Sequence, residues 1–416
     1  MSRAWAAHGP GRAARPAISA SDDAGAGATA QDFSLVLGGP LYQLLRCAHL
    51  SDGALGLAHR RLVAAVAIMW APLAMLSALQ RALIGPSART AFLDDVGFQV
   101  RFLLVAPLLI LAELMVHRRL QPVVDEFNIR GLIKPAQADQ FAQALSEAAR
   151  WRNAVVAEVA LLAVVYAAGV LFTLRRYQAM GGEGWFAAPG GEAGLSPAGL
   201  WLVFVSLPLL QFLLLRWYFR LFIWARFLWR VSRLDLDLDV THPDRSAGLG
   251  FLTESLAAFV PIAAAHGALF AGMIADRILF TGASLIDFQL EIVGGAVLLV
   301  LVFAGPLAVF GPRLECVKRA GLRRFGALGQ TYARDFRRKW FADGAPPDEP
   351  LVGSADIQSL ADLGNSYGAA EQMRFAPIRA SALLVFLAAY LAPIVPLLLT
   401  VMPAEKLLGR MVELVF

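Results

Sequence analysis

Among the ionisable side chains inside the long apolar stretches of this 416-residue chain, five are the strongest candidates for a function. They are Glu113, Glu158, Arg216, Arg220 and His266. A charge at the centre of a bilayer costs about 2.5–3.5 kcal/mol on insertion scales, so residues of this kind pair with one another or handle ions and protons. We therefore treat the five as a candidate intramembrane polar cluster.

Two interpretations of this cluster remain open from the sequence. Glu113, Glu158, Arg216 and Arg220 are expected at similar depths near one membrane surface. There they line a polar vestibule, or they form ion pairs that fix the packing of the helices. His266 lies in a stretch rich in small residues, which lets helices approach closely. It either hydrogen-bonds a neighbouring helix or relays protons.

A second set of candidates lies in a polar connection, where residues 241–245 read THPDR. Thr241 with Asp244 three positions later resembles a capping box and predicts the start of a helix. The capping box does not involve His242 or Arg245, so these two residues are candidates for binding a phosphate or an acidic partner. We expect the segment to lie in the cytoplasm.

A third polar segment, residues 353–366, reads GSADIQSLADLGNS. It predicts a helix that begins at the cap Ser354 and ends at Gly364. Asp356 and Asn365 mark the two ends of this helix. We expect it to pack beside THPDR in a small cytoplasmic cap.

The segment 234–240, LDLDLDV, alternates strictly and predicts a short strand. Its three aspartates face solvent and a basic helix, or they bind a divalent cation, although the glycine turn of an EF-hand is missing. The six histidines form no H-x3-H pair, and Cys47 and Cys316 form no C-x2-C pair. The sequence therefore predicts no catalytic residue, no established metal site and no cofactor, and it favours a role other than an enzyme.

The composition indicates the environment in which these residues must be positioned. The chain is 58% hydrophobic and 17% charged, whereas soluble domains have about 45–50% apolar and about 25% charged residues. The mean hydropathy is +0.58. Because a single soluble core stops growing near ~250–300 residues, the excess apolar surface needs a bilayer.

Seven stretches are long and apolar enough to cross a bilayer as helices, for which about 20 residues suffice. They are residues 62–84, 96–116, 154–174, 200–222, 251–274, 292–310 and 381–402. The sequence therefore predicts an all-α polytopic membrane protein with about seven transmembrane helices.

The basic residues alternate between the connections of these helices. Of the 37 lysines and arginines, 29 fall in the N-terminal arm and in every second connection after it. Cytoplasmic connections carry the excess of lysine and arginine. We therefore expect the N-terminus in the cytoplasm and the C-terminus outside.

Residues 1–32 are rich in Ala, Gly and Ser and predict a disordered arm, whereas residues 33–416 form the transmembrane domain with cytoplasmic loops 117–152, 223–250 and 311–379. The last loop opens with a basic amphipathic helix. This helix either contacts anionic lipid headgroups or packs on its neighbours. A second copy of the chain or a cytoplasmic protein is also a candidate partner, whereas the absence of a recognisable module argues against nucleic acid.

Three of these segments also carry a resemblance to a known group of proteins. They are RLFIWARFLWRVSRLDLDL at 220–238, THPDR with the following GLGFL, and GSADIQSLADLGNS. Together they resemble a family of bacterial polytopic inner-membrane proteins of uncharacterised activity, over about residue 33 to the end. The resemblance implies a multi-pass protein of a bacterial inner (cytoplasmic) membrane and carries over no activity.

Two functional classes follow from the sequence. A transporter or channel for a small solute or ion would use the intramembrane cluster as its entrance. A membrane-anchored sensor or assembly protein would instead bind a partner through its cytoplasmic loops. The charges favour the first class, and the odd number of helices with few ionisable groups near the midplane favours the second. Because polytopic helical bundles are often used in transport, we favour the transporter or channel class.

Overall fold

The computed structural model describes residues 33–47, 57–83, 91–179, 184–188, 194–342 and 354–400. The predicted arm at 1–32 lies outside these residues. Within them the chain is helical and carries two isolated β-bridges in place of a sheet. The helices run α1 Pro40–Cys47, α2 Ala58–Met69, α3 Ala71–Leu79, α4 Val96–Val100, α5 Ala106–Ile129, α6 Ala138–Arg152, α7 Val155–Val164, α8 Leu171–Ala179, α9 Pro197–Trp201, α10 Leu207–Ser232, α11 Glu254–Ala258, α12 Val260–Thr281, α13 Gln289–Ala304, α14 Gly311–Arg337, α15 Ala355–Glu371 and α16 Ala380–Leu391.

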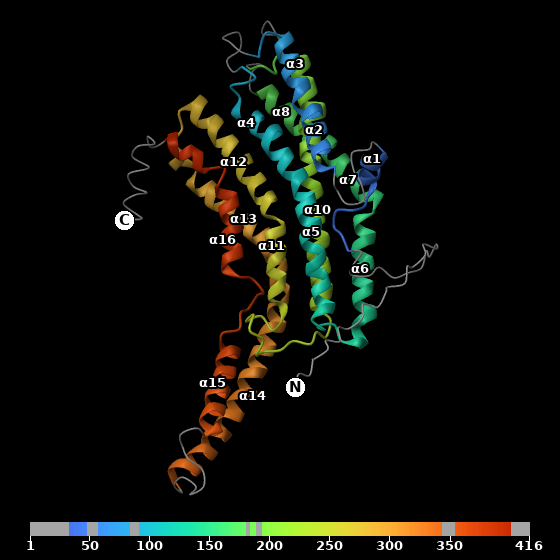
Figure 1. The fold of residues 1–416 in the computed structure, drawn as a ribbon. Helices are drawn as coiled ribbons and strands as arrows, with labels where there is room; N and C mark the ends of the chain where they lie inside the picture. Colours follow the sequence, from blue (N-terminus) through green and yellow to red (C-terminus); the bar gives the residue numbers. More distant parts are fainter. Residues whose placement is uncertain are drawn as a thin grey trace, which may run out of the picture.

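Six of the described helical segments are long and apolar enough to cross a membrane. They are Ala58–Leu79, Val96–Ile129, Val155–Arg175, Pro197–Ser232, Val260–Thr281 and Leu285–Phe341. These segments run side by side as a bundle (Figure 1). The chain is therefore an all-α multi-pass membrane protein, as the sequence predicts.

The seventh predicted span, 381–402, is interrupted. The helix α16 ends at Leu391, a turn follows, and a 3-10 helix covers Val395–Thr400. Pro393 lies in this turn and Pro396 lies in the 3-10 helix, and proline has no backbone N–H with which to continue an α-helix. Figure 1 shows α16 beside α12 in the bundle. Whether this segment crosses the membrane stays a prediction.

Prolines also break the regular hydrogen bonding of two spans, and neighbouring helices supply the missing donors. Pro72 leaves the carbonyl of Ile68 without its usual partner, and the indole Nε1 of Trp201 donates to that oxygen at 3.1 Å. Pro208 does the same to the carbonyl of Phe204, which accepts from the Tyr166 hydroxyl at 3.2 Å. Side chains thus replace water, which the hydrocarbon core does not provide.

Several predicted connections are shorter or more regular than expected. The helix α5 continues to Ile129, so the connection predicted from residue 117 begins only after it. The helix α10 runs beyond the apolar stretch 200–222, through the arginine-rich residues that follow it, to Ser232. The predicted helix after Pro135 is present as α6, with Phe141 and Leu145 buried. Helix extension is favoured here because the arginines of α10 are good helix residues.

The last long segment leaves the bundle. The helix α14 continues from α13 through a short 3-10 stretch, Gly305–Phe310, and α15 packs back against it. The resulting helical hairpin projects away from the bundle (Figure 1). The segment expected to form part of a small cap forms this hairpin, and the predicted helix end at Gly364 is wrong, because α15 runs on to Glu371.

The small residues of α12 bring two neighbouring helices into close contact. A Cβ atom added at Gly267 would overlap the backbone carbonyl of Tyr390 in α16. At Gly272 it would approach the Cα of Gly97 in α4 to 3.2 Å. The expectation that small residues permit close approach is met at these two contacts.

We predict that Gly267→Ala lowers the stability of the protein. Forcing a methyl group into a packed backbone contact costs about 1–3 kcal/mol. The measurement is the melting temperature of the purified protein in detergent. Gly294→Ala is the matched control, since nothing lies within 4 Å of a Cβ added there. Equal melting temperatures for the two variants would contradict the close contact between α12 and α16.

Candidate functional site

Four of the five predicted intramembrane residues meet in one cluster of ion pairs. Arg216 Nη1 lies 3.1 Å from Glu113 Oε1, and Arg220 Nη1 lies 2.8 Å from the same oxygen. Arg216 Nε also lies 3.0 Å from Glu158 Oε1. The cluster joins α5, α7 and α10, as expected for opposite charges at similar depths.

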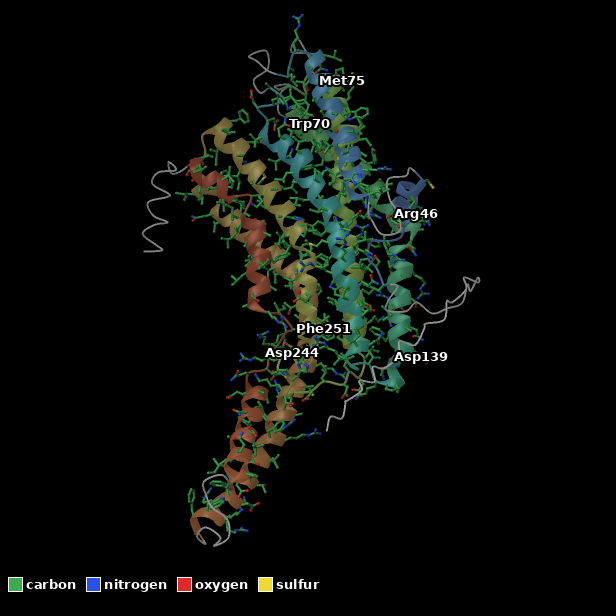
Figure 2. All side chains as sticks on the ribbon, viewed as in Figure 1. Arg46, Trp70, Met75, Asp139, Asp244 and Phe251 are labelled. Atoms are coloured by element: carbon green, nitrogen blue, oxygen red, sulfur yellow. The ribbon has the colours of Figure 1, made fainter. Side chains whose placement is uncertain are left out.

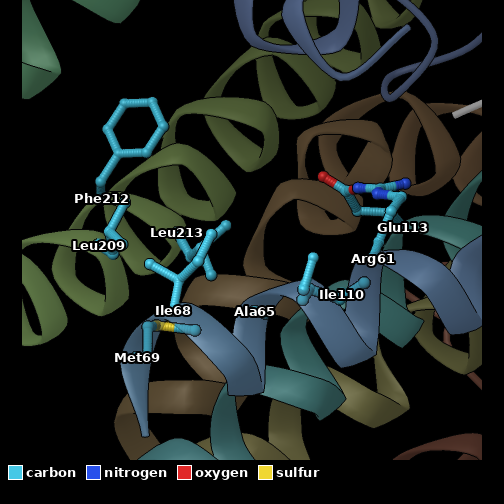
Figure 3. Close-up of a pocket in the computed structure, with 10 residues that line it drawn as sticks. Arg61, Ala65, Ile68, Met69, Ile110, Glu113, Leu209, Phe212 and Leu213 are labelled. Carbon is cyan, nitrogen blue, oxygen red and sulfur yellow. The ribbon is translucent and has the colours of Figure 1, made fainter. Parts of the chain in front are cut away.

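A fifth member comes from α2 and was not among the predicted site residues. Arg61 contacts the second carboxylate oxygen of Glu113, and Figure 3 shows the two side chains together. Arg61 comes directly before the first apolar stretch, 62–84. Its position only one residue before that run is the signal that could have placed it near Glu113.

Helix geometry explains why α10 contributes two arginines to the same acid. Residues four apart lie on one face of a helix, so Arg216 and Arg220 both point at Glu113. The Arg220 guanidinium also lies 4.8 Å from the ring centre of Trp217. The indole of Trp217 donates to the carbonyl of Leu109 at 3.0 Å, which fixes α10 against α5.

The cluster is closed to solvent. Arg61 is 8% exposed, Glu158 7%, Arg216 and Arg220 4% each, and Glu113 3%. Beside it is a cavity of about 10 Å³, lined by Arg152, Glu158, Arg216 and Arg220 among others. A cavity of this size holds about one water molecule. The arrangement therefore acts as a set of ion pairs that holds helices together.

His266 does not belong to this cluster, which corrects the predicted grouping. Its Nδ1 lies 2.7 Å from the carbonyl of Ile262, and its Nε2 lies 2.6 Å from the hydroxyl of Tyr218. Tyr218 follows Arg216 by two positions, so it lies on the opposite side of α10. The histidine links α12 to α10 through a hydrogen bond, which is the first of the two expected roles.

The THPDR segment forms a tight loop, and the predicted helix start at Thr241 is wrong. The carboxylate of Asp244 accepts from the backbone N–H groups of Ser246, Gly248 and Gly250 at 2.8–3.1 Å. Burial alone would raise the pKa of Asp244, but these three hydrogen bonds outweigh it and hold the pKa below its usual range. The helix start therefore lies after the loop, at the 3-10 helix Leu249–Thr253.

The remaining THPDR side chains have local roles. His242 Nδ1 lies 3.0 Å from Asp244 Oδ1. Arg245 is exposed, with a positive φ of 56°, and its carbonyl accepts from the backbone of Arg374 at 2.8 Å. Figure 2 places Asp244 near Phe251, where the bundle meets the hairpin. Because His242 contacts Asp244, Arg245 is the residue left for binding an anion.

Asp356 and Asn365 lie apart from THPDR, so the predicted grouping of these motifs is wrong. Asp356 Oδ2 is 2.7 Å from Lys339 Nζ and 3.1 Å from Trp340 Nε1. The hydrogen bond from Lys339 is the main cause of a lowered pKa of Asp356. Asn365 is exposed on α15. Both residues belong to the hairpin, where α15 packs on α14.

The LDLDLDV segment is extended but forms no strand. It makes a single bridge, between Leu236 and Ile133, while Leu234 and Leu236 are buried. Asp235 lies 2.6 Å from Lys134 Nζ and 2.5 Å from Arg313 Nη2 of α14. The expected contact with the basic helix is thus present for Asp235. No group of three or more potential metal ligands occurs in the part of the chain that the structure describes.

The fold and the cluster define a multi-pass membrane protein with buried ion pairs between α2, α5, α7 and α10. Comparison of the chain with protein-family models, curated proteins and solved structures gave no match.

We predict that Glu113→Gln destabilises the bundle strongly. Removing this carboxylate leaves three buried arginines around one remaining acid, and breaking a buried ion pair costs about 3–5 kcal/mol. The free energy of unfolding in mixed micelles measures the loss. Glu147→Gln is the control, because Glu147 pairs with the partly exposed Arg226 and Arg230, and exposed pairs contribute about 0–1 kcal/mol. A similar loss in both variants would contradict the assigned role.

Proposed function

We propose that this protein resides in a bacterial inner membrane and anchors the α14/α15 hairpin in the cytoplasm, where the hairpin binds an acidic protein partner. The alternation of basic residues along the sequence supports this orientation. The resemblance of the three sequence motifs supports the choice of membrane. The single observation that carries the functional proposal is the exposed, basic hairpin.

The direction of α14 favours a protein over the lipid headgroups. Its 27 residues span about 40 Å, and it continues from a membrane-spanning segment and leads away from the bundle (Figure 1). Charges in solution are screened beyond about 8–10 Å. The distal basic side chains, such as Arg334 and Arg338, therefore lie beyond the reach of the headgroups.

The net charge of residues 311–342 indicates which charge the partner carries. Residues 311–342 contain nine basic and two acidic side chains. Arg324, Arg334 and Arg338 are exposed. Complementary potentials steer association and exclude partners of the wrong sign. An acidic protein surface is the complement of this helix.

The hairpin also leaves apolar surface uncovered. Only Gly311, Leu314 and Gly321 of α14 and Ala370 of α15 are buried. Leu328 is 54% exposed, Ile357 46% and Phe341 74%. The helices α14 and α15 cover each other on one side only, so apolar side chains on their other sides stay exposed. Exposed apolar patches with polar rims mark interaction sites. A bound protein would cover these side chains.

The transport alternative depends on the intramembrane cluster. Its acids and arginines are bonded to one another and are at most 8% exposed. We therefore assign the cluster to packing, and the hairpin becomes the better candidate for function. Transport stays an alternative that a flux measurement in proteoliposomes addresses.

We predict that a photo-crosslinking amino acid at Leu328 captures a specific acidic protein in the native cells. Arg324 lies one turn away, and Arg324→Glu should lower the yield of the adduct about tenfold, because it replaces attraction by repulsion. Mass spectrometry identifies the adduct and measures its yield.

Arg175→Glu is the control for this experiment, since Arg175 is an exposed arginine on α8, distant from the hairpin in sequence. It should leave the yield unchanged. Three outcomes would contradict the proposal. The adduct could be lost in both variants, it could contain only a second copy of the chain, or the purified protein could conduct ions while no adduct forms.

A further inference from the structure

A groove between α2, α5 and α10 runs along the membrane-spanning part of the bundle. It has a volume of about 160 Å³ and is lined by the apolar side chains of Ala65, Ile68, Met69, Ile110, Leu209 and Phe212. An apolar cavity of similar volume accepts a molecule of benzene. The groove is therefore large enough for part of an acyl chain.

One end of this groove is charged. Arg61 and Glu113 line the same groove (Figure 3). The three buried arginines Arg61, Arg216 and Arg220 share the carboxylates of Glu113 and Glu158. Because arginine stays protonated in proteins, these ion pairs leave one positive charge in surplus. An uncompensated buried charge is costly, so an anion at this end would stabilise the site.

A second cavity, beside the same cluster, has a further arginine in its lining. It is lined by Arg152 together with Arg216, Arg220 and Glu158. Arg152 Nη1 donates to the carbonyl of Ser34 at 2.6 Å, a neutral acceptor that leaves its charge unbalanced. Anionic oxygens near the cluster would therefore face a region of positive potential.

The order of apolar and charged residues is the same on all three helices. Along α10, Leu209 precedes Arg216 by seven positions, and along α2, Ile68 follows Arg61 by seven. Seven residues of helix correspond to about 10 Å. The apolar part of the groove therefore lies deeper in the membrane than its charged end, which matches the depth of an acyl chain below its headgroup.

We propose that this groove binds one anionic phospholipid. Its acyl chain lies along the apolar side chains of α2, α5 and α10, and its phosphate balances the surplus of the arginine cluster. The lipid thereby completes the charge balance at the junction of the four helices. This site is separate from the hairpin and does not depend on the partner proposed for it.

Native mass spectrometry of the purified full chain tests the proposal. After incubation with phosphatidylglycerol, the wild-type protein should retain one lipid molecule, and retention of phosphatidylcholine with the same acyl chains should be at least about tenfold lower. This comparison needs no substitution. Equal retention of the two lipids would overturn the charge recognition.

A substitution tests the position of the acyl chain. Ala65→Phe fills the groove and should abolish the retained phosphatidylglycerol, whereas Val63→Phe should leave it unchanged, because Val63 is 68% exposed on the same helix. Retention by the Ala65→Phe variant would overturn the groove as the binding site. The melting temperature of the lipid-free protein is also measured with inorganic phosphate and with phosphatidylglycerol. An equal rise with both would show a site for a free anion and would also overturn the proposal.

Discussion

The buried carboxylate of Glu113 is the interaction on which the arrangement of the bundle depends. It receives arginines from α2 and from α10 and lies on α5, and Arg216 extends the network to Glu158 on α7. Removing such charges from water is expensive, and their mutual attraction offsets the cost only in a well-fitted geometry. The four helices are therefore fixed in one relative position around the cluster, where a mismatch of depth would leave a charge unpaired.

The same constraint operates where the backbone is irregular. Trp201 and Tyr166 donate to carbonyls that Pro72 and Pro208 leave free, because lipid offers no substitute for the lost hydrogen bond. The hairpin of α14 and α15 is the contrasting part of the molecule. It buries few of its side chains and leaves charged and apolar groups exposed. The bundle buries its side chains, whereas the hairpin it carries leaves them exposed, and this contrast supports an anchoring role.

The sequence predicts those features that follow from apolar length and from the cost of burying charge. The long spans and the pairing of Glu113 with Arg216 are of this kind. Arg61 could not be assigned, because its role depends on how far α2 extends before its apolar run. The hydrogen bonds of Asp244 depend on a loop conformation with positive φ angles at Arg245 and Ala247, which no periodicity encodes. Gly364 suggested a helix end, but the contact of α15 with α14 outweighs the low helix propensity of glycine.

Hydrogen exchange of the Glu113→Gln protein in lipid nanodiscs tests most directly whether this one carboxylate positions several helices. The backbone amides of each helix are compared with those of the unaltered protein by mass spectrometry. Faster exchange in α2, α5, α7 and α10 together, with α12 and α16 unchanged, is the expected result. Faster exchange confined to α5, or none at all, would contradict the central role of Glu113.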